Sequence, residues 1–336
     1  MSSEQVDRIR RVAFVGKASG QVGSAILNSL LRTGNQEITI FTRPDSKSTF
    51  PTSSNINVVK VDYSSEQAMI SALRDHDFLI VTLSTSAPPT LHSEIVAAAA
   101  KAGVQWIMPN YWAFATGERG GALAAEPLFA NFANYINDVR NVSVPEGGVK
   151  PNFVALANGF WYEFSLGMGE PWFGFDMKNR KVTLYDEGDV RINTSTWDLC
   201  GKAVASLLSL PVSGGSDDEP ALDDWKNDTV TVSSFLVSQR DMLDSLNRVL
   251  GISDADWTIT KQPAKERFQQ GLQQLQEGNR LGFAQAMYAR LFFPGDGGDY
   301  ETGYGLDNGK LGLPKEDLDE ATKRAVEMVN GGFGIH

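Results

Sequence analysis

Three glycines near the start of the chain have the spacing and context of an anion-binding loop. Gly16, Gly20 and Gly23 stand between the apolar run of residues 11–16 and a segment whose apolar residues recur every four positions. A strand, a tight turn and a helix N-terminus in this order let the backbone approach a diphosphate group closely. The segment therefore predicts a dinucleotide-binding loop, although a turn without a ligand is the alternative. The predicted contacts are Gly16, Lys17, Ala18, Ser19, Gly20, Gln21 and Val22.

An arginine follows the second predicted strand and indicates which dinucleotide is bound. Units that bind NAD place an acidic residue about twenty residues beyond the loop, whereas units that bind NADP place an arginine nearby. Arg43 stands there, with Thr42 before it and Lys47 after it as further contacts. These residues predict NADP(H). The alternative is that Arg43 is solvated and that Asp45 binds the ribose.

Strand-like and helical segments alternate through the first half of the chain. This alternation is typical of an α/β fold, here a Rossmann-type doubly wound parallel sheet with a smaller, interleaved α+β substrate lobe. We expect an NADP-binding domain over residues 1–158 and a mainly substrate-binding lobe over 159–336, with 181–210 returning to the first domain. The expected strands are 11–16, 37–43, 56–62, 77–84, 104–109 and 152–158, and a later strand is expected at 229–237.

Composition restricts the class of protein. Hydrophobic residues make up 42% and charged residues 21%, and the formal net charge is −11. Such a charge disfavours nucleic acid and anionic membranes as partners. The single cysteine, Cys200, excludes an intrachain disulfide, and the polar N-terminus lacks the apolar stretch of a signal peptide. A cytoplasmic protein with a small-molecule substrate is expected, and its oligomeric state stays open. The histidines lack metal-ligand spacing, so no metal is expected.

Several longer motifs extend across the chain. They are VAFVGKASGQVGSAIL, FTR, VTLS, ANGFWYEFSLG, STWDLCGKAVASLL and GLDNGKLGLPKEDLDEAT. In these motifs the chain resembles the NmrA-like, isoflavone-reductase-like branch of the short-chain dehydrogenase superfamily, especially its fungal members. The resemblance implies an NADP(H)-binding Rossmann domain and a carboxy-terminal substrate lobe. It further implies that Asp62 and Tyr63 lie near the adenine and that Ser84, Thr85 and Ser86 lie along the ribose and nicotinamide.

Two departures from this family concern the glycine loop and the proton donor. Lys17 takes the place of the family's first glycine, and Gly16 stands one position upstream. Reductases of the family usually carry a lysine in the helix after the fifth strand, at about Asn131 or Phe132, but residues 122–139 contain no lysine. No Y-x-x-x-K pair occurs anywhere in the chain. The usual proton donor is therefore missing.

The residues after the fourth, fifth and sixth strands should line a site, because ligands of open α/β sheets bind beyond the carboxyl ends of the strands. The polar candidates for catalysis are Tyr111, Asn110 and Tyr162, of which Tyr111 is the first choice; a tyrosine packed in the wall is the alternative. Asn110 and Asn158 are also expected to contact the cofactor. His92 could approach this cleft, or be an ordinary partly buried histidine.

Aromatic residues from the same strand ends suggest a flat apolar pocket, with a role in the core as the alternative. The candidates for substrate contact are Trp112, Phe114, Phe160, Trp161 and Phe164. The resulting hypothesis is an NADP(H)-dependent oxidoreductase acting on a C=C, C=N or C=O bond of an aromatic or alkaloid-like molecule in specialised metabolism, with cyclisation as a coupled step. An NADP(H)-sensing regulator without turnover is the alternative from another class.

Overall fold

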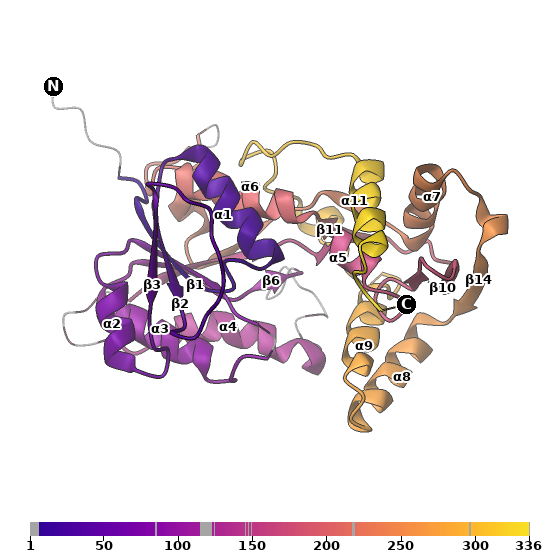
Figure 1. Cartoon of the computed structure of the whole chain (residues 1–336), viewed down its shortest axis with the longest axis horizontal. Coiled ribbons are helices and arrows are strands. Elements are labelled where there is room, and N and C mark those ends of the chain that lie inside the picture. The colour runs from indigo at the N-terminus through magenta and orange to yellow at the C-terminus, as the bar shows by residue number, and fades with distance from the viewer. Residues whose placement is uncertain are drawn as a thin grey trace.

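A parallel sheet forms the centre of the first lobe (Figure 1). The computed structural model describes residues 7–84, 86–114, 123, 125–144, 146, 148, 150–216, 219–295 and 297–335. Along the sheet the strand order is β12-β7-β5-β4-β1-β2-β3, and β6 pairs beside β7. Every pairing described for this sheet is parallel, so the carboxyl ends of its strands share one edge. The strands are β1 (Arg11–Gly16), β2 (Glu37–Thr42), β3 (Ile56–Lys60), β4 (Phe78–Thr82), β5 (Trp106–Met108), β6 (Trp112–Ala113), β7 (Asn152–Ala157) and β12 (Asp228–Thr231).

Alternate side chains of β1 enter two cores, one on each face of the sheet. Val12 and Phe14 belong to the core that contains residues of α1 and α6, whereas Ala13 and Val15 belong to the core under α2, α3 and α4. This alternation is what a strand buried on both faces requires. Figure 1 shows the two helical layers above and below the strands. The helices are α1 (Gln21–Thr33), α2 (Glu66–Leu73), α3 (Leu91–Ala102), α4 (Ala130–Arg140) and α6 (Trp197–Ser209). The predicted fold class is confirmed.

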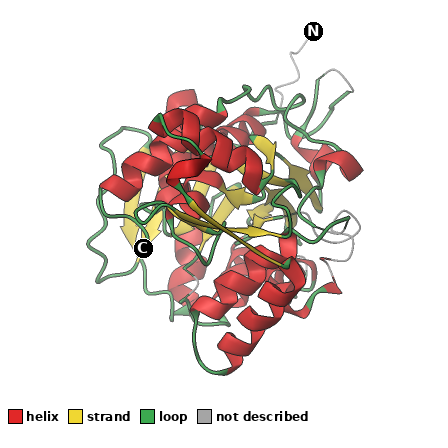
Figure 2. Cartoon of the chain, turned by 90° about the vertical axis from the view of Figure 1, so that its right-hand side faces the viewer, coloured by secondary structure: helices red, strands yellow, loops and turns green. Residues whose placement is uncertain are grey.

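The remaining elements form the second lobe, which Figure 2 views face on. It contains two small sheets, with the orders β14-β10-β9 and β13-β11-β8. Their strands are β8 (Phe160–Trp161), β9 (Phe175–Asp176), β10 (Lys181–Tyr185), β11 (Ile192–Ser195), β13 (Phe235–Val237) and β14 (Thr258–Gln262). The helices are α5 (Tyr162–Gly167), α7 (Gln239–Leu250), α8 (Ala264–Gln276), α9 (Leu281–Leu291), α10 (Glu301–Tyr304) and α11 (Leu318–Asn330), with a short 3-10 turn at η4 (Asp254–Asp256). Two other 3-10 turns belong to the first lobe: η2 (Pro127–Phe129) contacts α4, and η3 (Leu222–Trp225) contacts β12.

Residues 181–210 are divided between the two lobes. Helix α6 packs against α1, and Gly201 permits this approach because a Cβ there would collide with the Ala25 carbonyl oxygen. Strand β10, in contrast, pairs with β14 in the second lobe. Of the segment 181–210 that was expected to return to the first domain, α6 therefore lies on the Rossmann unit and β10 does not.

The strand predicted over residues 229–237 is two strands in different sheets. β12 pairs with β7 at the edge of the main sheet, and β13 pairs with β11 in the second lobe. Ser233 and Ser234 separate them, and the Ser233 hydroxyl donates to the carbonyls of Thr194 and Phe235. Two consecutive serines that bond to the backbone allow the chain to leave one sheet for the other.

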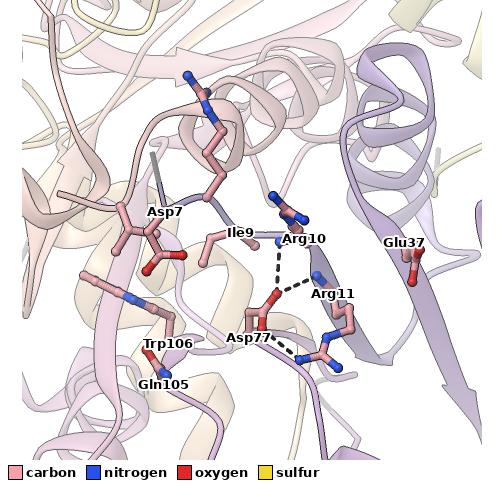
Figure 3. Close-up of a pocket in the computed structure, with 10 residues that line it drawn as sticks. Asp7, Ile9, Arg10, Arg11, Glu37, Asp77, Gln105 and Trp106 are labelled. Carbon is pink, nitrogen blue, oxygen red and sulfur yellow. Dashed lines mark hydrogen bonds and ion pairs between the residues drawn. The ribbon is translucent and has the colours of Figure 1, made fainter. Parts of the chain in front are cut away.

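The amino ends of the strands are held together by Asp77, which precedes β4 (Figure 3). Asp77 Oδ2 accepts hydrogen bonds from the backbone N–H groups of Arg10 and Arg11, at 3.0 and 2.8 Å, and Oδ1 pairs with the Arg11 guanidinium at 3.5 Å. A cavity of about 580 Å³ lies here, lined by three arginines and by Asp7, Glu37 and Asp77. Because its positive and negative side chains balance, this cavity does not select an anion.

Candidate functional site

A second cavity, of about 520 Å³, lies at the opposite edge of the sheet, beyond the carboxyl ends of β1, β2 and β4. This is where ligands bind in open α/β folds. Its lining includes the glycine loop, the residues after β2 and the residues after β4. The lining residues are Gly16, Lys17, Ser19, Gly20, Thr42, Arg43, Ser46, Ser48, Tyr63, Leu83, Ser84, Ser86, Ala87, Pro88 and Leu91.

At two of its three glycines, the glycine loop packs so closely against neighbouring backbone that a side chain would not fit. Gly16 has φ +109°, and a Cβ there would collide with the Thr82 carbonyl at the end of β4. At Gly23 a Cβ would collide with the Lys17 carbonyl, whereas at Gly20 a Cβ would make a tight contact of 3.2 Å with the Lys17 carbonyl oxygen but would not overlap it. The wider glycine spacing of this loop therefore still gives a tight turn, in which Lys17 N–H donates to the Thr82 carbonyl at 2.6 Å.

The start of α1 presents free hydrogen-bond donors to this cavity. The N-cap is Gly20, and no side chain caps the helix. The first N–H groups of a helix have no partner within it and attract anions. A diphosphate fits here because the cavity reaches Gly20 and the helix supplies the donors. Of the other predicted loop contacts, Ala18 and Val22 are buried and belong to the core beneath the loop, and Gln21 is exposed.

Two cations line the cavity. Lys17 lies in the glycine loop, and Arg43 follows β2 with a side chain that is 70% exposed. The Arg43 guanidinium lies 3.7 Å from Asp45, which does not line the cavity. Lys47 and Asp62 are exposed and also lie outside the lining. The Asp62 carboxylate instead accepts hydrogen bonds from Ser64, which lower its pKa.

Tyr63 forms a wall of the cavity beside Arg43. Its hydroxyl donates to the Phe41 carbonyl at 2.5 Å. Burial raises the pKa of Tyr63 to about 12, and the nearby Gly16 backbone and Arg43 charge offset only part of this shift. Tyr63 therefore stays neutral and provides a rigid surface.

The wall after β4 contains Leu83, Ser84, Ser86, Ala87 and Pro88. Ser84 and Ser86 line the cavity and their hydroxyls are 2.9 Å apart, while Thr85 lies outside the described residues. Asn110, which follows β5, accepts a hydrogen bond at Oδ1 from the Leu83 N–H at 2.8 Å. Asn110 thus supports this wall from behind.

The two tyrosines predicted as proton donors have their hydroxyls bound elsewhere. Tyr111 is fully buried and its hydroxyl donates to the Phe114 carbonyl. Tyr162 is also fully buried, and its hydroxyl lies 2.7 Å from that of Thr322 in α11. Burial raises the pKa of Tyr162 above its ordinary value of 10. Neither residue lines the cavity described above, because both are part of the core.

The predicted aromatic wall is divided between two clusters. Phe114 contacts Phe129, Phe132 and Phe160, with ring centroids 4.5–6.4 Å apart, and Phe160 stacks on Tyr288 at 3.8 Å. Trp161 and Phe164 lie in another cluster with Trp172, Trp197 and Phe333. The expectation of one continuous wall is therefore corrected: Phe114 and Phe160 share one ring cluster, and Trp161 and Phe164 share another.

The side chains of two further predicted site residues form hydrogen bonds with backbone carbonyls. The Trp112 indole N–H donates to the Val81 carbonyl at 3.1 Å. Asn158 is fully buried, and its amide nitrogen donates to the Gly159 carbonyl at 2.9 Å. Asn158 Oδ1 has no hydrogen-bond partner among the residues that the structure describes.

Sequence reasoning missed part of the lining. Ser46 and Ser48 come from the loop after Arg43, and the Ser19 hydroxyl donates to that of Ser48 at 3.0 Å. The run of polar residues 45–48 after β2 was a signal for such a loop. Ala87 was expected among the residues after the fourth strand, whereas Leu83, Pro88 and Leu91 gave no signal, because apolar residues at strand and helix ends are usually core.

Comparison with known proteins supports this interpretation of the cavity. A family model described as NAD(P)H-binding matches residues 18–141. The chain therefore contains an NAD(P)H-binding domain. Oxidoreductase aprR of Aspergillus flavus is 26% identical over 311 residues, which cover 92% of this chain and 96% of the relative.

Two solved structures share the fold over nearly the whole chain. AtPrR2 with NADP+ and (+)pinoresinol has a TM-score of 0.69 at 15% identity and covers 94% of this chain and 98% of its own. An isoflavone reductase has a TM-score of 0.68 at 13% identity and covers 94% and 99%. These matches show the fold that the resemblance implied. Among the described residues, no helix combines the length and the apolar character that crossing a membrane would need.

Proposed function

We propose that this NAD(P)H-binding protein is an NADP(H)-dependent oxidoreductase of specialised metabolism that acts on an aromatic or alkaloid-like small molecule. One observation carries the cofactor preference: Lys17 and Arg43 line the same cavity as the uncapped start of α1. Two cations beside a diphosphate site suit the additional phosphate of NADP(H). The oxidoreductase activity rests on the similarity to aprR and on the fold shared with AtPrR2, whose structure holds NADP+ and (+)pinoresinol.

Different residues of this chain would bind different parts of the cofactor. The glycine loop and the first N–H groups of α1 would hold the diphosphate, and Arg43 with Lys17 would hold the 2′-phosphate. When bound, the nicotinamide supplies or accepts the hydride. β4 and β2 lie on opposite sides of β1. The nicotinamide half of the cofactor would therefore lie against the residues after β4 that line the cavity, Leu83, Ser84, Ser86, Ala87 and Pro88.

The buried hydroxyls of Tyr111 and Tyr162 favour a substrate that needs no proton from them. In α4, Phe132 packs against Tyr111 and Phe114, at centroid distances of 6.3 and 5.7 Å. The neighbourhood of Tyr111 is therefore aromatic. A substrate that already carries a positive charge, such as an iminium, can accept a hydride without a general acid. Phe114 and Phe160 are buried and do not line the cavity. We therefore assign the apolar contacts of this substrate to Leu83, Ala87, Pro88 and Leu91, and cyclisation of the product is an extension of the same proposal.

Fluorescence titration with NADPH and NADH tests the cofactor preference. We expect NADPH to bind at least tenfold more tightly, and tighter binding of NADH would overturn the preference. NADPH oxidation is then followed against imines, iminium ions and enones that bear aromatic rings. Turnover of the cationic substrates is the expected result. Cofactor binding without turnover of any of them would instead favour an NADP(H) sensor.

A further inference from the structure

His92, at the start of α3, is held on both sides of its ring. The side chain is 1% exposed. Nδ1 lies 2.7 Å from Asp138 Oδ2 in α4, and Nε2 lies 3.2 Å from the backbone nitrogen of Asn110 after β5. The ring also packs on Tyr135, with centroids 4.7 Å apart. His92 thus joins two helices and the end of a strand.

These contacts determine the tautomer of His92. A backbone N–H can only donate, so Nε2 must accept the hydrogen bond from Asn110 and carries no proton. The proton of the neutral ring is then on Nδ1, where the Asp138 carboxylate accepts it. Asp138 therefore orients the imidazole so that its free lone pair faces Asn110.

The series of hydrogen bonds continues into the wall of the cavity. Asn110 Oδ1 accepts from the Leu83 N–H at 2.8 Å, and Leu83 lines the cavity together with Ser84 and Ser86. Three hydrogen bonds thus connect Asp138, which is 26% exposed at the surface, to this wall. On the other side of β1, the loop around Arg43 takes no part in this series.

We propose that His92 and Asp138 are positioning residues for the cofactor. Through Asn110 they hold Leu83, Ser84 and Ser86 in place, and thereby the part of the cavity that receives the nicotinamide half. The inference rests on the NADP(H) binding proposed above. The proposal predicts different effects on the two halves of the cofactor. Loss of the His92 contact should weaken contacts to the nicotinamide half and leave contacts to the adenosine half intact.

The His92→Leu variant tests this with two ligands, NADPH and adenosine 2′,5′-bisphosphate. Leucine keeps the apolar packing but leaves the Asn110 N–H without an acceptor, a change that is typically worth about tenfold in an equilibrium constant. We expect NADPH to bind about tenfold more weakly and the bisphosphate, which has no nicotinamide, to bind within about twofold of wild type. Glutamine at the same position can place a carbonyl oxygen near the site of Nε2, so His92→Gln should restore most of the NADPH affinity.

A matched control is Tyr185→Phe in the second lobe. The Tyr185 hydroxyl is fully buried and donates to the Trp172 carbonyl at 2.6 Å, so its removal also leaves a buried group unpaired. We expect this variant to have a lower melting temperature but to bind both ligands as tightly as wild type. If His92→Leu does not fold, the same two titrations are made with Asp138→Ala, whose partly exposed position tolerates truncation.

Three results would overturn the inference. NADPH affinity equal to wild type in His92→Leu would show that the wall does not depend on His92. Equal loss of NADPH and bisphosphate would show a general structural role. Failure of the wild type to bind either ligand would overturn the proposed function, and with it this inference.

Discussion

The carbonyl oxygen of Lys17 occupies the position that a Cβ of Gly23 would need. Gly23 lies in the first turn of α1, and Lys17 lies in the loop before it, so the contact presses the loop against the helix. The backbone of residues 16–20 is thereby held beside the cavity. This relationship explains why the third glycine is required even though the spacing of the loop is unusual.

The Gly23→Ala variant should therefore damage both stability and cofactor binding. A methyl group here must displace backbone, and overpacking of this kind costs about 1–3 kcal/mol. Urea unfolding measures the loss, and NADPH titration measures the effect on the loop. Gly20→Ala is the control for stability alone, because a Cβ there makes a tight contact of 3.2 Å without overlap and Gly20 itself lines the cavity. Equal stability of the two variants would contradict this account.

The Arg43→Gln variant should change cofactor preference. Loss of a charge-assisted contact from an exposed side chain should weaken NADPH binding about tenfold and change NADH binding less than twofold. Fluorescence titration of both cofactors measures this. Asp45→Asn serves as the control, because it removes the ion pair at 3.7 Å without touching the cavity lining. The prediction fails if both cofactors lose affinity equally.

The Tyr111→Phe variant separates a structural tyrosine from a catalytic one. Because its buried hydroxyl donates to the Phe114 carbonyl, we expect the free energy of unfolding to fall by about 1–3 kcal/mol. Turnover of any substrate found in the panel should remain within about twofold of wild type. A loss of a hundredfold or more at unchanged stability would identify Tyr111 as the proton donor after all. Tyr162→Phe should behave in the same way.

The Glu163→Gln variant should alter how stability depends on pH. Glu163 is 3% exposed, and burial raises its pKa above the ordinary 4.5 although Arg324 Nη2 lies 3.0 Å from Oε1. A carboxyl with a raised pKa binds more protons in the folded state, so its contribution to stability is complete below pH 4.5 and is lost as pH rises through the raised pKa. Glutamine has no such loss.

Chemical unfolding between pH 4 and pH 8 tests this, with the exposed Glu327→Gln as the control. The free energy of unfolding of Glu163→Gln should rise relative to wild type as the pH increases through the weakly acidic range. A constant difference between the two proteins across this range would show that the pKa of Glu163 is not raised.

Much of the first lobe could be predicted because its signals are local. The strand before Gly16, the periodic residues of α1 and the position of Arg43 lie within about thirty residues of one another, and each follows from backbone geometry and side-chain periodicity. The site residues after β4 and β5 were also expected at the correct edge of the sheet. The direction in which their side chains point could not be predicted. Periodicity distinguishes buried from exposed faces, but it does not identify the residue with which a buried side chain forms a hydrogen bond or ring contact.

The sequence by itself predicted a dinucleotide-binding unit with Lys17, Arg43 and Lys47 near its phosphate site, since a glycine turn and a helix start are made by consecutive residues. The tertiary structure decided that Lys47 lies outside the lining of the cavity. Only the tertiary structure decided that Tyr111 and Tyr162 are bound within the core, that the aromatic residues divide into two clusters, and that His92 supports Asn110. Each of these depends on a hydrogen bond or ring contact, and several of them join residues far apart in the chain, as Tyr162 and Thr322 are. Such pairings are set by how whole elements pack, so no short stretch of sequence specifies them.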